Sequence, residues 1–407
     1  MQERLLIVTP AFAPSVGGYA HAATNFAVAV QRFSSVEVTV CTPALEGHAN
    51  GDQGTHLESG LTLISLPRRA AGFRYRALVE QVLWAKQVAQ LLNSERWHKV
   101  LIETMEQPLM TWLLLRLVSA EQRAKIMVRM HGTNALEGFL TSSRLLHRWY
   151  WRMVSSNLRR LDHLCTTTPY YLDFVAEHVF AGTLPADKRY SVVSNVVWAP
   201  ADAEPDSATP GASVDLLALG RLNKAGYHQK NFELLAHGVK TYLEQGGSQD
   251  LKVVVIGEGE SRETFTQLLR QLDIARYFEL HNRADNSTVR LLQQNARGVM
   301  MLSRFEGQSM FALEAVASGA SLVVTQGTGS TSLVEDGRTG YVIAQNDPVA
   351  LAEAVNKLMN APAHAQREAV RARYDACYHP EVIVDAFLRD AGFSGHSQDG
   401  AFETKTN

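Results

Sequence analysis

The strongest constraint on the fold is a regular alternation between short apolar runs and longer amphipathic stretches. In the first half of the chain, runs typical of buried strands stand at Leu5–Thr9, Val36–Cys41, Leu61–Leu66, Lys99–Glu103, Ala124–Met130, His163–Thr167 and Tyr190–Ser194. Helical patterns lie between them, for example at Ala20–Phe33, Ala77–Leu92 and Gln107–Val118. Strands that alternate with helices form a parallel sheet that is covered on both faces. The sequence therefore predicts an α/β fold.

The alternation is interrupted once, at residues 198–213, and then resumes. This segment contains three prolines and has no hydrophobic period, which is typical of a linker. Strand patterns follow at Val214–Leu219, Leu251–Ile256, Phe278–His281, Gly298–Leu302, Ser321–Thr325 and Gly340–Ile343, with helical patterns at Asn231–Gln245 and Arg262–Leu272. We therefore expect two Rossmann-like, doubly wound domains with a cleft between them, where ligands bind at the carboxyl ends of the strands.

The composition is that of an ordinary soluble protein, with 46% hydrophobic and 20% charged residues among 407. The sequence has no run of about 18 apolar residues and no signal-peptide pattern, so we expect neither a membrane span nor export. The three cysteines are scattered, fit a reduced cytosolic protein and show no metal-ligand spacing. These features together predict a cytoplasmic location.

The charge is distributed unevenly along the chain. Residues 1–195 carry 20 Lys and Arg against 15 Asp and Glu, whereas residues 196–407 carry 19 against 26. A mildly basic first half suits an anionic partner, such as a phosphate-bearing substrate or a membrane surface. The excess is too small to indicate nucleic acid.

The most informative motif is the segment EGQSMFALE, from Glu306 to Glu314. A strand is expected to end near Ser303, and a helix is expected to start near Ser309. The free N–H groups of the first helical turn and the helix dipole form an anion site suited to a diphosphate, with Met310 and Phe311 in that turn. Glu314, one turn further, could accept hydrogen bonds from ribose hydroxyls, and Glu306 could reach the sugar. By spacing alone, a solvated helix with two ordinary glutamates explains the same segment.

This segment resembles the EX7E motif of the retaining glycosyltransferase family 4, whose members have the two-domain GT-B fold. The surrounding sequence is similar to the family as well: EAVASG followed by Leu322-Val323-Val324 resembles "EAMA.G.PVV", and VEDGRTG resembles "V.DG.TG". The resemblance covers most of residues 214–390. One stretch departs from the pattern: the family often has Gly-Gly-x-x-Glu where this chain has Thr328-Gly329-Ser330-Thr331-Ser332, so the first Gly and the Glu are absent.

The resemblance also implies roles for a glycine and two basic residues after the first strand of the second half. Gly220 at a strand end permits a tight turn. Arg221 and Lys230 match the family's Arg and Lys, which bind the donor diphosphate without a metal and here could neutralise the leaving group. Lys224 is a competing match, and a plain surface loop is the alternative for both positions.

Three further glycines and a histidine are candidates at other strand ends. Gly17 and Gly18 match a family loop that faces the donor phosphates and acceptor, although their spacing is not GxGxxG. In the family, a histidine at the place of His131 lies beside the donor sugar, whereas a lone histidine near a strand end is often structural. Gly257, in Gly257-Glu258-Gly259, resembles the family's "GDGP" loop and is expected to be a structural turn near the nucleotide.

A basic and aromatic stretch without any acid runs from Phe139 to Leu161. It holds Arg144, His147, Arg148, Trp149, Tyr150, Trp151, Arg152, Arg159 and Arg160, and a second basic cluster holds Arg68, Arg69, Arg74 and Arg76. A helix of this composition could rest on an anionic membrane surface, at the inner face of a membrane. The alternative is a solvated helix face with aromatic residues in the core.

The resemblance implies a GT-B fold with a first domain at residues 1–197 that binds the acceptor and a second at 198–376 that binds the nucleotide sugar. Residues 377–393, with a helix at about Pro380–Arg389, are expected to pack back on the first domain, and residues 394–407 to form a flexible tail. We expect a retaining, metal-independent hexosyltransferase that uses no cofactor. It would move a sugar from a UDP- or GDP-linked donor to a glycan or lipid-linked acceptor, in surface polysaccharide biosynthesis.

Three other functions stay open at this stage. Another GT-B enzyme, such as a glycan phosphorylase or a sugar-nucleotide epimerase, would use the same cleft. A nicotinamide-dependent oxidoreductase would need GxGxxG after the first strand, and that motif is missing. A non-catalytic binding protein on the same fold is also open, although both glutamates and the Arg–Lys pair argue against it.

Overall fold

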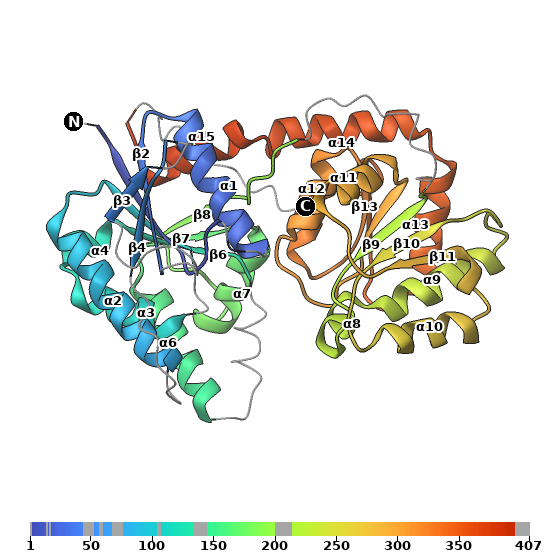
Figure 1. Ribbon diagram of the computed structural model, residues 1–407, viewed down its shortest axis with the longest axis horizontal. Helices are drawn as coiled ribbons and strands as arrows, with labels where there is room; N and C mark the ends of the chain where they lie inside the picture. Colours follow the sequence, from blue (N-terminus) through green and yellow to red (C-terminus); the bar gives the residue numbers. More distant parts are fainter. Residues whose placement is uncertain are drawn as a thin grey trace. The chain divides into compact units, whose positions relative to one another are not determined.

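The computed structural model describes residues 2–13, 15, 18–43, 53–56, 60–66, 76–103, 107–132, 145–199 and 214–394. The chain divides into two compact units (Figure 1). The first runs to Val196 and takes in the residues from Pro380 onward, and the second is Val197–His379. The expected linker at 198–213 and the expected tail at 394–407 lie almost wholly outside the described residues.

The first unit is built on an eight-stranded sheet with the order β3-β4-β2-β1-β5-β6-β7-β8. Its strands are β1 (Arg4–Val8), β2 (Glu37–Pro43), β3 (Gln53–His56), β4 (Thr62–Leu66), β5 (Lys99–Ile102), β6 (Ile126–Met130), β7 (His163–Thr166) and β8 (Arg189–Val192). The central strands are buried along almost their whole length, as expected for a sheet covered on both faces.

Two details of this sheet differ from the sequence prediction. The edge strand β3 is antiparallel to β4, and its residues Gln53-Gly54-Thr55-His56 carry no apolar run that could have indicated a strand. The strand predicted to start at Ala124 starts at Ile126, because Ser119 and Gln122 form a capping box that begins a short helix, α4 (Ala120–Ala124).

The other described helices of this unit are α1 (Gly18–Phe33), α2 (Arg76–Ser94), α3 (Pro108–Leu117), α6 (Leu145–Arg160), α7 (Pro169–Val179) and α15 (Pro380–Ala391). Although α15 is far from α1 in sequence, the two helices pack together. The ring of Phe387 meets that of Phe26 edge-on, with 5.1 Å between centroids, and both side chains are fully buried. The backbone N–H of Ser394 donates to the carboxylate of Glu3 at 3.0 Å. The segment after residue 379 is therefore part of the first unit's core.

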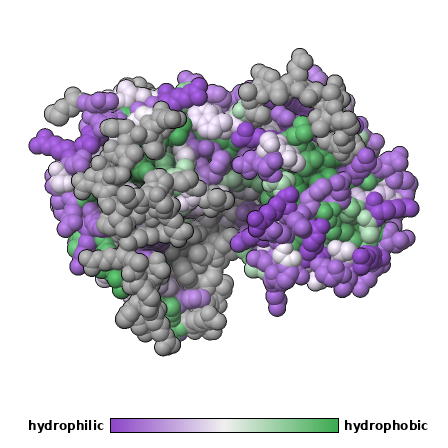
Figure 2. Space-filling view, viewed as in Figure 1, coloured by the Kyte–Doolittle hydropathy of each residue, from purple (hydrophilic) through white to green (hydrophobic). Residues whose placement is uncertain are grey.

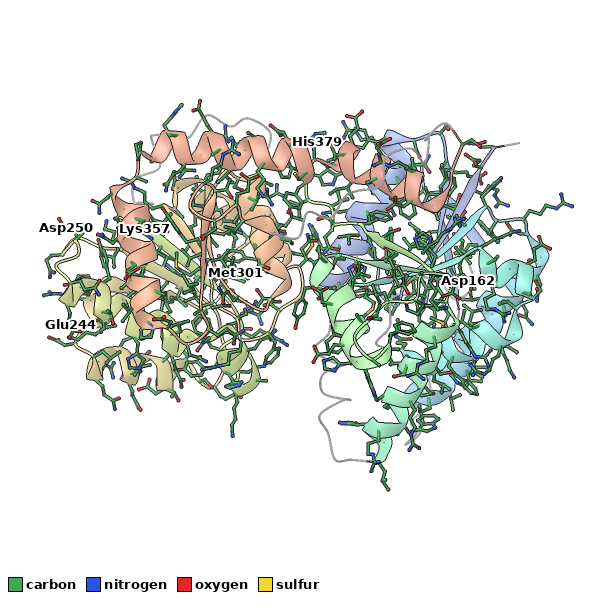
Figure 3. All side chains as sticks on the ribbon, turned by 180° about the vertical axis from the view of Figure 1, so that it is seen from behind. Asp162, Glu244, Asp250, Met301, Lys357 and His379 are labelled. Atoms are coloured by element: carbon green, nitrogen blue, oxygen red, sulfur yellow. The ribbon has the colours of Figure 1, made fainter. Side chains whose placement is uncertain are left out.

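The second unit has a fully parallel six-stranded sheet with the order β11-β10-β9-β12-β13-β14. Its strands are β9 (Leu216–Leu219), β10 (Val253–Ile256), β11 (Phe278–His281), β12 (Gly298–Met301), β13 (Ser321–Thr325) and β14 (Gly340–Ile343). Seen from behind, Met301 lies in the interior of the unit, whereas Glu244, Asp250 and Lys357 lie at its periphery (Figure 3).

The helices of the second unit are α8 (Lys224–Lys230), α9 (Phe232–Glu244), α10 (Arg262–Gln271), α11 (Asn286–Asn295), α12 (Met310–Ala317), α13 (Pro348–Asn360) and α14 (Ala363–Cys377), with the 3₁₀ turns η1 (Ala275–Tyr277) and η2 (Gly329–Leu333). On the face of this unit that Figure 2 shows, hydrophilic residues surround patches of hydrophobic ones. Apolar residues of the strands and helices form a core on each side of the sheet.

Candidate functional site

The carboxyl ends of β9, β10 and β12 bring most of the predicted donor residues to one edge of the second sheet. Leu219 of β9 pairs in register with Ile256 of β10, so Gly220 and Gly257 follow side by side. A Cβ on Gly257 would stand only 2.0 Å from the carbonyl oxygen of Gly220. Glycine is therefore required at position 257 for the two strand ends to approach this closely.

The loop that contains Gly257 is held by other parts of the unit. Arg262 donates to the carbonyl oxygens of Gly257 (3.2 Å) and Leu280 (2.7 Å), and the N–H of Leu222 donates to the carbonyl of Glu258 at 2.8 Å. These contacts favour the reading of this loop as a structural turn that shapes the strand edge.

Lys230 and Glu306, two predicted catalytic residues, form an ion pair in the second unit. The carboxylate of Glu306 also accepts a hydrogen bond from the hydroxyl of Ser303 at 3.0 Å. Both side chains of the pair are mostly buried, with 20% of Lys230 and 16% of Glu306 exposed. The structure therefore brings together a lysine and a glutamate that stand 76 residues apart in the sequence.

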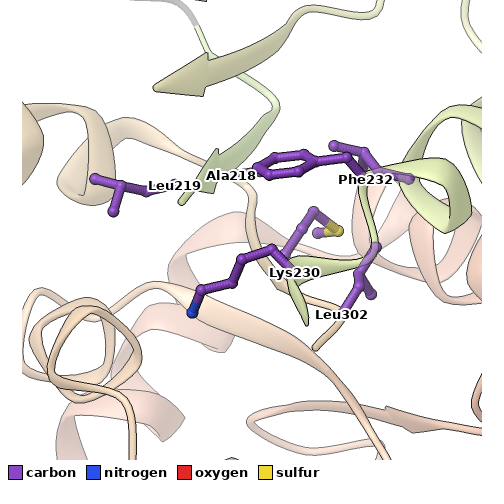
Figure 4. A pocket seen from close by; sticks show the side chains of 7 residues that line it. Ala218, Leu219, Lys230, Phe232 and Leu302 are labelled. Atoms are coloured by element: carbon purple, nitrogen blue, oxygen red, sulfur yellow. The ribbon is translucent and has the colours of Figure 1, made fainter. Parts of the chain in front are cut away.

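Gly220 leaves room for the Lys230 side chain. A Cβ at this glycine would lie 2.7 Å from Cγ of Lys230. Lys230 also lines a small pocket with Ala218, Leu219, Phe232, Leu235, Met300 and Leu302. Its amine points away from Phe232 and Leu302 (Figure 4). The apolar stem of Lys230 is thus packed while its charge reaches the polar edge.

The two other basic residues that the sequence predicts for this edge, Arg221 and Lys224, are exposed. Arg221 follows Gly220 directly, and among the described residues its guanidinium has no ion pair or hydrogen bond. Lys224 stands at the first position of α8, where its backbone N–H donates to the carboxylate of Glu260 at 2.9 Å. Of the two candidate lysines, only Lys230 contacts Glu306, which favours Lys230 over Lys224 as the match to the family's lysine.

Helix α12 begins where the sequence predicts it. Ser309 is the N-cap residue, and its hydroxyl accepts from the N–H of Ala312 at 3.4 Å. The N–H groups of Met310 and Phe311 precede the first intrahelical bond, so they have no acceptor within the helix. Phe311 itself is buried in the core. Met310 and Phe311 can thus offer an anion their backbone N–H groups.

Glu314 lies in the second turn of α12 and is largely buried. Burial raises the pKa of its carboxyl, and the positive charge of Arg290 on α11 partly opposes that shift. Within the described part of the chain, its carboxylate has no ion pair. An acceptor of this kind is suited to the hydroxyls of a ligand.

The stretch that departs from the family pattern, Thr328–Ser332, contacts the backbone of Glu306 and is held by several hydrogen bonds. The N–H of Gly329 donates to the carbonyl oxygen of Glu306 at 2.9 Å. The carbonyl of Ser332 accepts from Arg373 Nη2 at 2.7 Å and from the hydroxyl of Tyr378 at 2.6 Å. This stretch therefore fixes the backbone of Glu306.

In the first unit, His131 follows β6 and joins a buried ionic cluster that sequence reasoning missed. Its Nε2 contacts the carboxylate of Glu103, and Glu103 is paired with Arg129 at 2.8 Å. Glu103 and Arg129 are fully buried. The missed signal was a charged residue inside an apolar run, in Met127-Val128-Arg129-Met130, and another at the end of Val100-Leu101-Ile102-Glu103.

The predicted N-terminal glycines are placed only in part. Gly18 is the first residue of α1 and is exposed. Gly17 lies outside the described residues. The ring of Tyr19, next in the chain, lies 5.0 Å from that of His131. The start of α1 and the end of β6 thus meet in the first unit.

A metal-ligand cluster and a membrane-spanning helix are both absent from the part of the chain that the structure describes. The described residues contain no group of three His, Cys, Asp or Glu side chains that could hold a metal ion. None of the described helices is both long and apolar enough to cross a bilayer.

Two sequence models of known families match the chain. "Glycosyl transferase 4-like domain" matches residues 17–195, and "Glycosyl transferases group 1" matches residues 213–361. Together they cover well over half of the sequence. The chain belongs to the glycosyltransferase family that these two domains characterise. The resemblance predicted from the sequence is thereby confirmed.

Curated relatives carry related names. The chain is 31% identical to glycogen synthase of Mycobacterium tuberculosis over 244 residues, which are 60% of this chain and 56% of that protein. It is 26% identical over 187 residues to D-inositol 3-phosphate glycosyltransferase of Corynebacterium diphtheriae, with 39% of this chain and 44% of that protein covered. The chain thus spans about half the length of the curated relatives that it matches.

A solved structure shows the same fold over almost the whole chain. Sucrose-phosphate synthase of Thermosynechococcus elongatus superposes with a TM-score of 0.72 at 14% identity, covering 94% of this chain and 96% of that one. The Anabaena HepE protein in complex with UDP gives a TM-score of 0.68 at 12% identity, covering 96% and 99%. The predicted GT-B fold is confirmed.

Proposed function

We propose that this chain transfers a sugar from a UDP- or GDP-linked donor to a glycan or lipid-linked acceptor, with retention of the anomeric configuration and without a metal. The second unit would bind the donor and the first the acceptor. The observation that carries the proposal is the ion pair of Lys230 with Glu306, on a parallel-sheet edge that also presents Arg221. Such edges are where ligands of doubly wound sheets bind.

Each group at this edge has a role in the proposal. Lys230, Arg221 and the N-terminus of α12 would stabilise the charge that develops on the departing nucleotide diphosphate. Glu306 would orient the sugar, and Glu314 would accept from the ribose hydroxyls. In the first unit, His131 would lie beside the donor sugar and shape the reacting face. Because cationic side chains neutralise the leaving group, the proposal needs no metal.

The relatives support a nucleotide-sugar donor. One solved structure of the same fold holds UDP, and the curated relatives are named as sugar-transferring enzymes. A role in surface polysaccharide biosynthesis and a cytoplasmic location are parts of the proposal that rest on the sequence alone.

A panel of nucleotides tests the donor part. UDP, GDP, ADP and their glucose or mannose esters are added to the protein, and the thermal midpoint is recorded, because a ligand of the folded state raises it. We expect the nucleotides of one base to raise the thermal midpoint, and to do so when EDTA has removed metal ions. No shift with any member of the panel would contradict the proposal.

Three variants test which basic residues stabilise the departing nucleotide diphosphate. Arg221→Ala should lower turnover by about 10²–10³-fold, as does removal of one charge-stabilising donor elsewhere. Lys230→Ala should do the same. Lys224→Ala is the matched control, since Lys224 is an exposed cation on the same helix as Lys230. A larger loss in Lys224→Ala than in Lys230→Ala would reverse the choice of lysine.

The alternative enzyme functions are distinguished by products. A transferase needs an acceptor and releases a nucleoside diphosphate, whereas an epimerase returns a nucleotide sugar and a phosphorylase consumes phosphate. A retained α-linkage in the product, read by NMR, supports the retaining mechanism. An inverted product would refute it.

A second candidate property, contact with an anionic membrane, is favoured by the first turns of α6. Leu145, Leu146 and Trp149 expose 81%, 52% and 44% of their surface, and Arg148 and Arg152 are exposed on the same helix. Apolar and basic side chains exposed together suit a bilayer surface that carries anionic lipids. Co-sedimentation with phosphatidylserine vesicles at low salt should be lost in Leu145→Ser/Trp149→Ser. Equal binding by that variant would contradict the contact.

A further inference from the structure

A buried ionic cluster of three side chains lies beneath the carboxyl ends of β5 and β6. The carboxylate of Glu103 meets Arg129 twice: Oε1 lies 2.8 Å from Nη2, and Oε2 accepts from Nε at 3.0 Å. The guanidinium of Arg129 also stacks at 3.8 Å over the ring of Phe26. Burial alone would raise the pKa of Glu103, but the positive charge of Arg129 and the hydrogen bonds from His131 and Arg129 lower it below its ordinary value. The buried guanidinium of Arg129 therefore favours the ionised form of the Glu103 carboxylate.

His131 is the third member of the cluster, and neighbours hold both its backbone and its ring. Its Nε2 contacts Oε2 of Glu103, its carbonyl oxygen accepts from the hydroxyl of Tyr171 at 2.8 Å, and the ring of Tyr19 packs beside it. Only 9% of the side chain is exposed. The ring thus has little freedom to turn.

The chemistry of this contact decides which ring nitrogen carries the proton. An ionised carboxylate only accepts hydrogen bonds, so Nε2 of His131 must be the N–H that donates to it. In the neutral ring, Nδ1 is then an acceptor. Among the described residues Nδ1 is buried without a hydrogen-bond partner. Buried acceptors in folded proteins nearly always have a hydrogen-bond partner, and a hydroxyl of a ligand would supply one to Nδ1.

We propose that Glu103, supported by Arg129, is a positioning residue that holds His131 as the Nε2–H tautomer and so reserves Nδ1 for a hydroxyl of the substrate. Arg129 acts on His131 only through Glu103, because its positive charge keeps the buried carboxylate ionised. The inference rests on the proposed function for the nature of the substrate, but the tautomer itself is independent of that function.

The tautomer is measured by NMR of the full chain labelled with ¹⁵N-histidine, with His131→Gln identifying the signals. We expect the unaltered protein to show a protonated Nε2 and an unprotonated Nδ1 at neutral pH. The test variant is Glu103→Gln/Arg129→Met, because Glu103→Gln alone would leave a buried unpaired charge and could unfold the unit. In the double variant the two tautomers should be mixed. A protonated Nδ1 in the unaltered protein, or an unchanged tautomer in the variant, would overturn the proposal.

Turnover supplies a second readout, with UDP-glucose as the donor and UDP release as the signal. The double variant should lower kcat by at least about tenfold with little change in KM, as loss of a group that orients a reacting side chain does. The same change made in a His131→Gln background should add no further loss, because Glu103 acts through His131. A full additional loss there would overturn the positioning role. If the unaltered protein releases no nucleotide from any donor in the panel, the proposed function fails, and the NMR result alone decides the positioning.

Discussion

At the scale of single residues, Lys230 and Glu306 are each other's ionic partners. A diphosphate that binds Lys230 would replace Glu306 as the ionic partner of the lysine. The carboxylate of Glu306 would then be available to a sugar hydroxyl. The ion pair satisfies two partly buried charges, and in the proposed function the donor would replace one partner.

This exchange predicts a selective loss in Lys230→Ala. The variant should bind UDP at least about tenfold more weakly, since a charge-assisted contact to phosphate is lost, but bind UMP nearly as well. Titration calorimetry with the two nucleotides, or with GDP and GMP if the panel selects guanine, measures the difference. Equal losses for both nucleotides would show that Lys230 does not contact the second phosphate.

A second residue-scale prediction concerns His163, which is buried and bonded to Ser191 at 2.6 Å. Burial, with Lys99 and Arg189 nearby, lowers its pKa to about 3. The unfolded chain binds a proton below about pH 6.5 that the folded protein does not, so stability is lost as pH falls from about 6.5 towards 3. The loss from this group should approach about 1.4 kcal/mol per pH unit.

Chemical denaturation between pH 7 and pH 5 measures that slope. His163→Gln should flatten it, while His364→Gln, a substitution at a histidine whose side chain is 87% exposed, should leave it unchanged. If the slope of His163→Gln matches that of the unaltered protein, another group causes the acid sensitivity.

Residues of the second unit were easier to find from the sequence than those of the first. Ser309 and Glu306 are recognisable because a strand, a loop and a helix follow one another locally. Glu103 and His131 are 28 residues apart and meet only because β5 and β6 are neighbours in the sheet. A pairing of that kind depends on strand order, which a hydrophobic pattern does not contain.

At the scale of elements, the end of β9 depends on a residue without a side chain. Gly220→Ala would place a methyl group 2.7 Å from Cγ of Lys230 and 3.3 Å from the ring of Phe232. Because a lysine stem is flexible, we expect Lys230 to move rather than the strand to break. Affinity for the nucleoside diphosphate should fall at least about tenfold with only a small change in the thermal midpoint.

A double variant checks this explanation. In a Lys230→Ala background, Gly220→Ala should weaken the nucleoside diphosphate no further, since the displaced side chain is already absent. An additional loss would mean that the methyl group disturbs the strand edge itself.

Elements with buried apolar runs follow the sequence closely, and elements without them do not. Strand β13, which is buried along its whole length, has the predicted bounds to the residue. The helix α8 holds KAGYHQK, which has no apolar stripe, and it forms because Asn223 caps it by accepting from Gly226 at 2.7 Å. Its C-terminal residue is followed by Asn231 in the left-handed conformation, which lets α9 start at once in a new direction.

At the scale of the whole molecule, the first unit is assembled from two separate stretches of sequence. Phe387 of α15 is fully buried against α1, so Phe387→Ala should lower the unfolding free energy of this unit by about 3–5 kcal/mol. Val382→Ala on the same helix is the control, because Val382 is 39% exposed.

Tryptophan fluorescence is suited to the measurement. Five of the six tryptophans, Trp84, Trp97, Trp112, Trp149 and Trp151, belong to the first unit. The signal therefore reports mainly on that unit during denaturation. A shift as small as that of the control would mean that α15 adds little to the first unit's stability.

The same arrangement has a consequence during synthesis on the ribosome. Domains generally fold as they emerge, the N-terminal one first. Here the first 196 residues must wait for a helix that is translated only after the whole second unit. Until residue 391 leaves the exit tunnel, the apolar side of α1 around Phe26 lacks its cover and is a surface that a chaperone would recognise. The second unit can thus finish folding first, although most of the first unit is made before it.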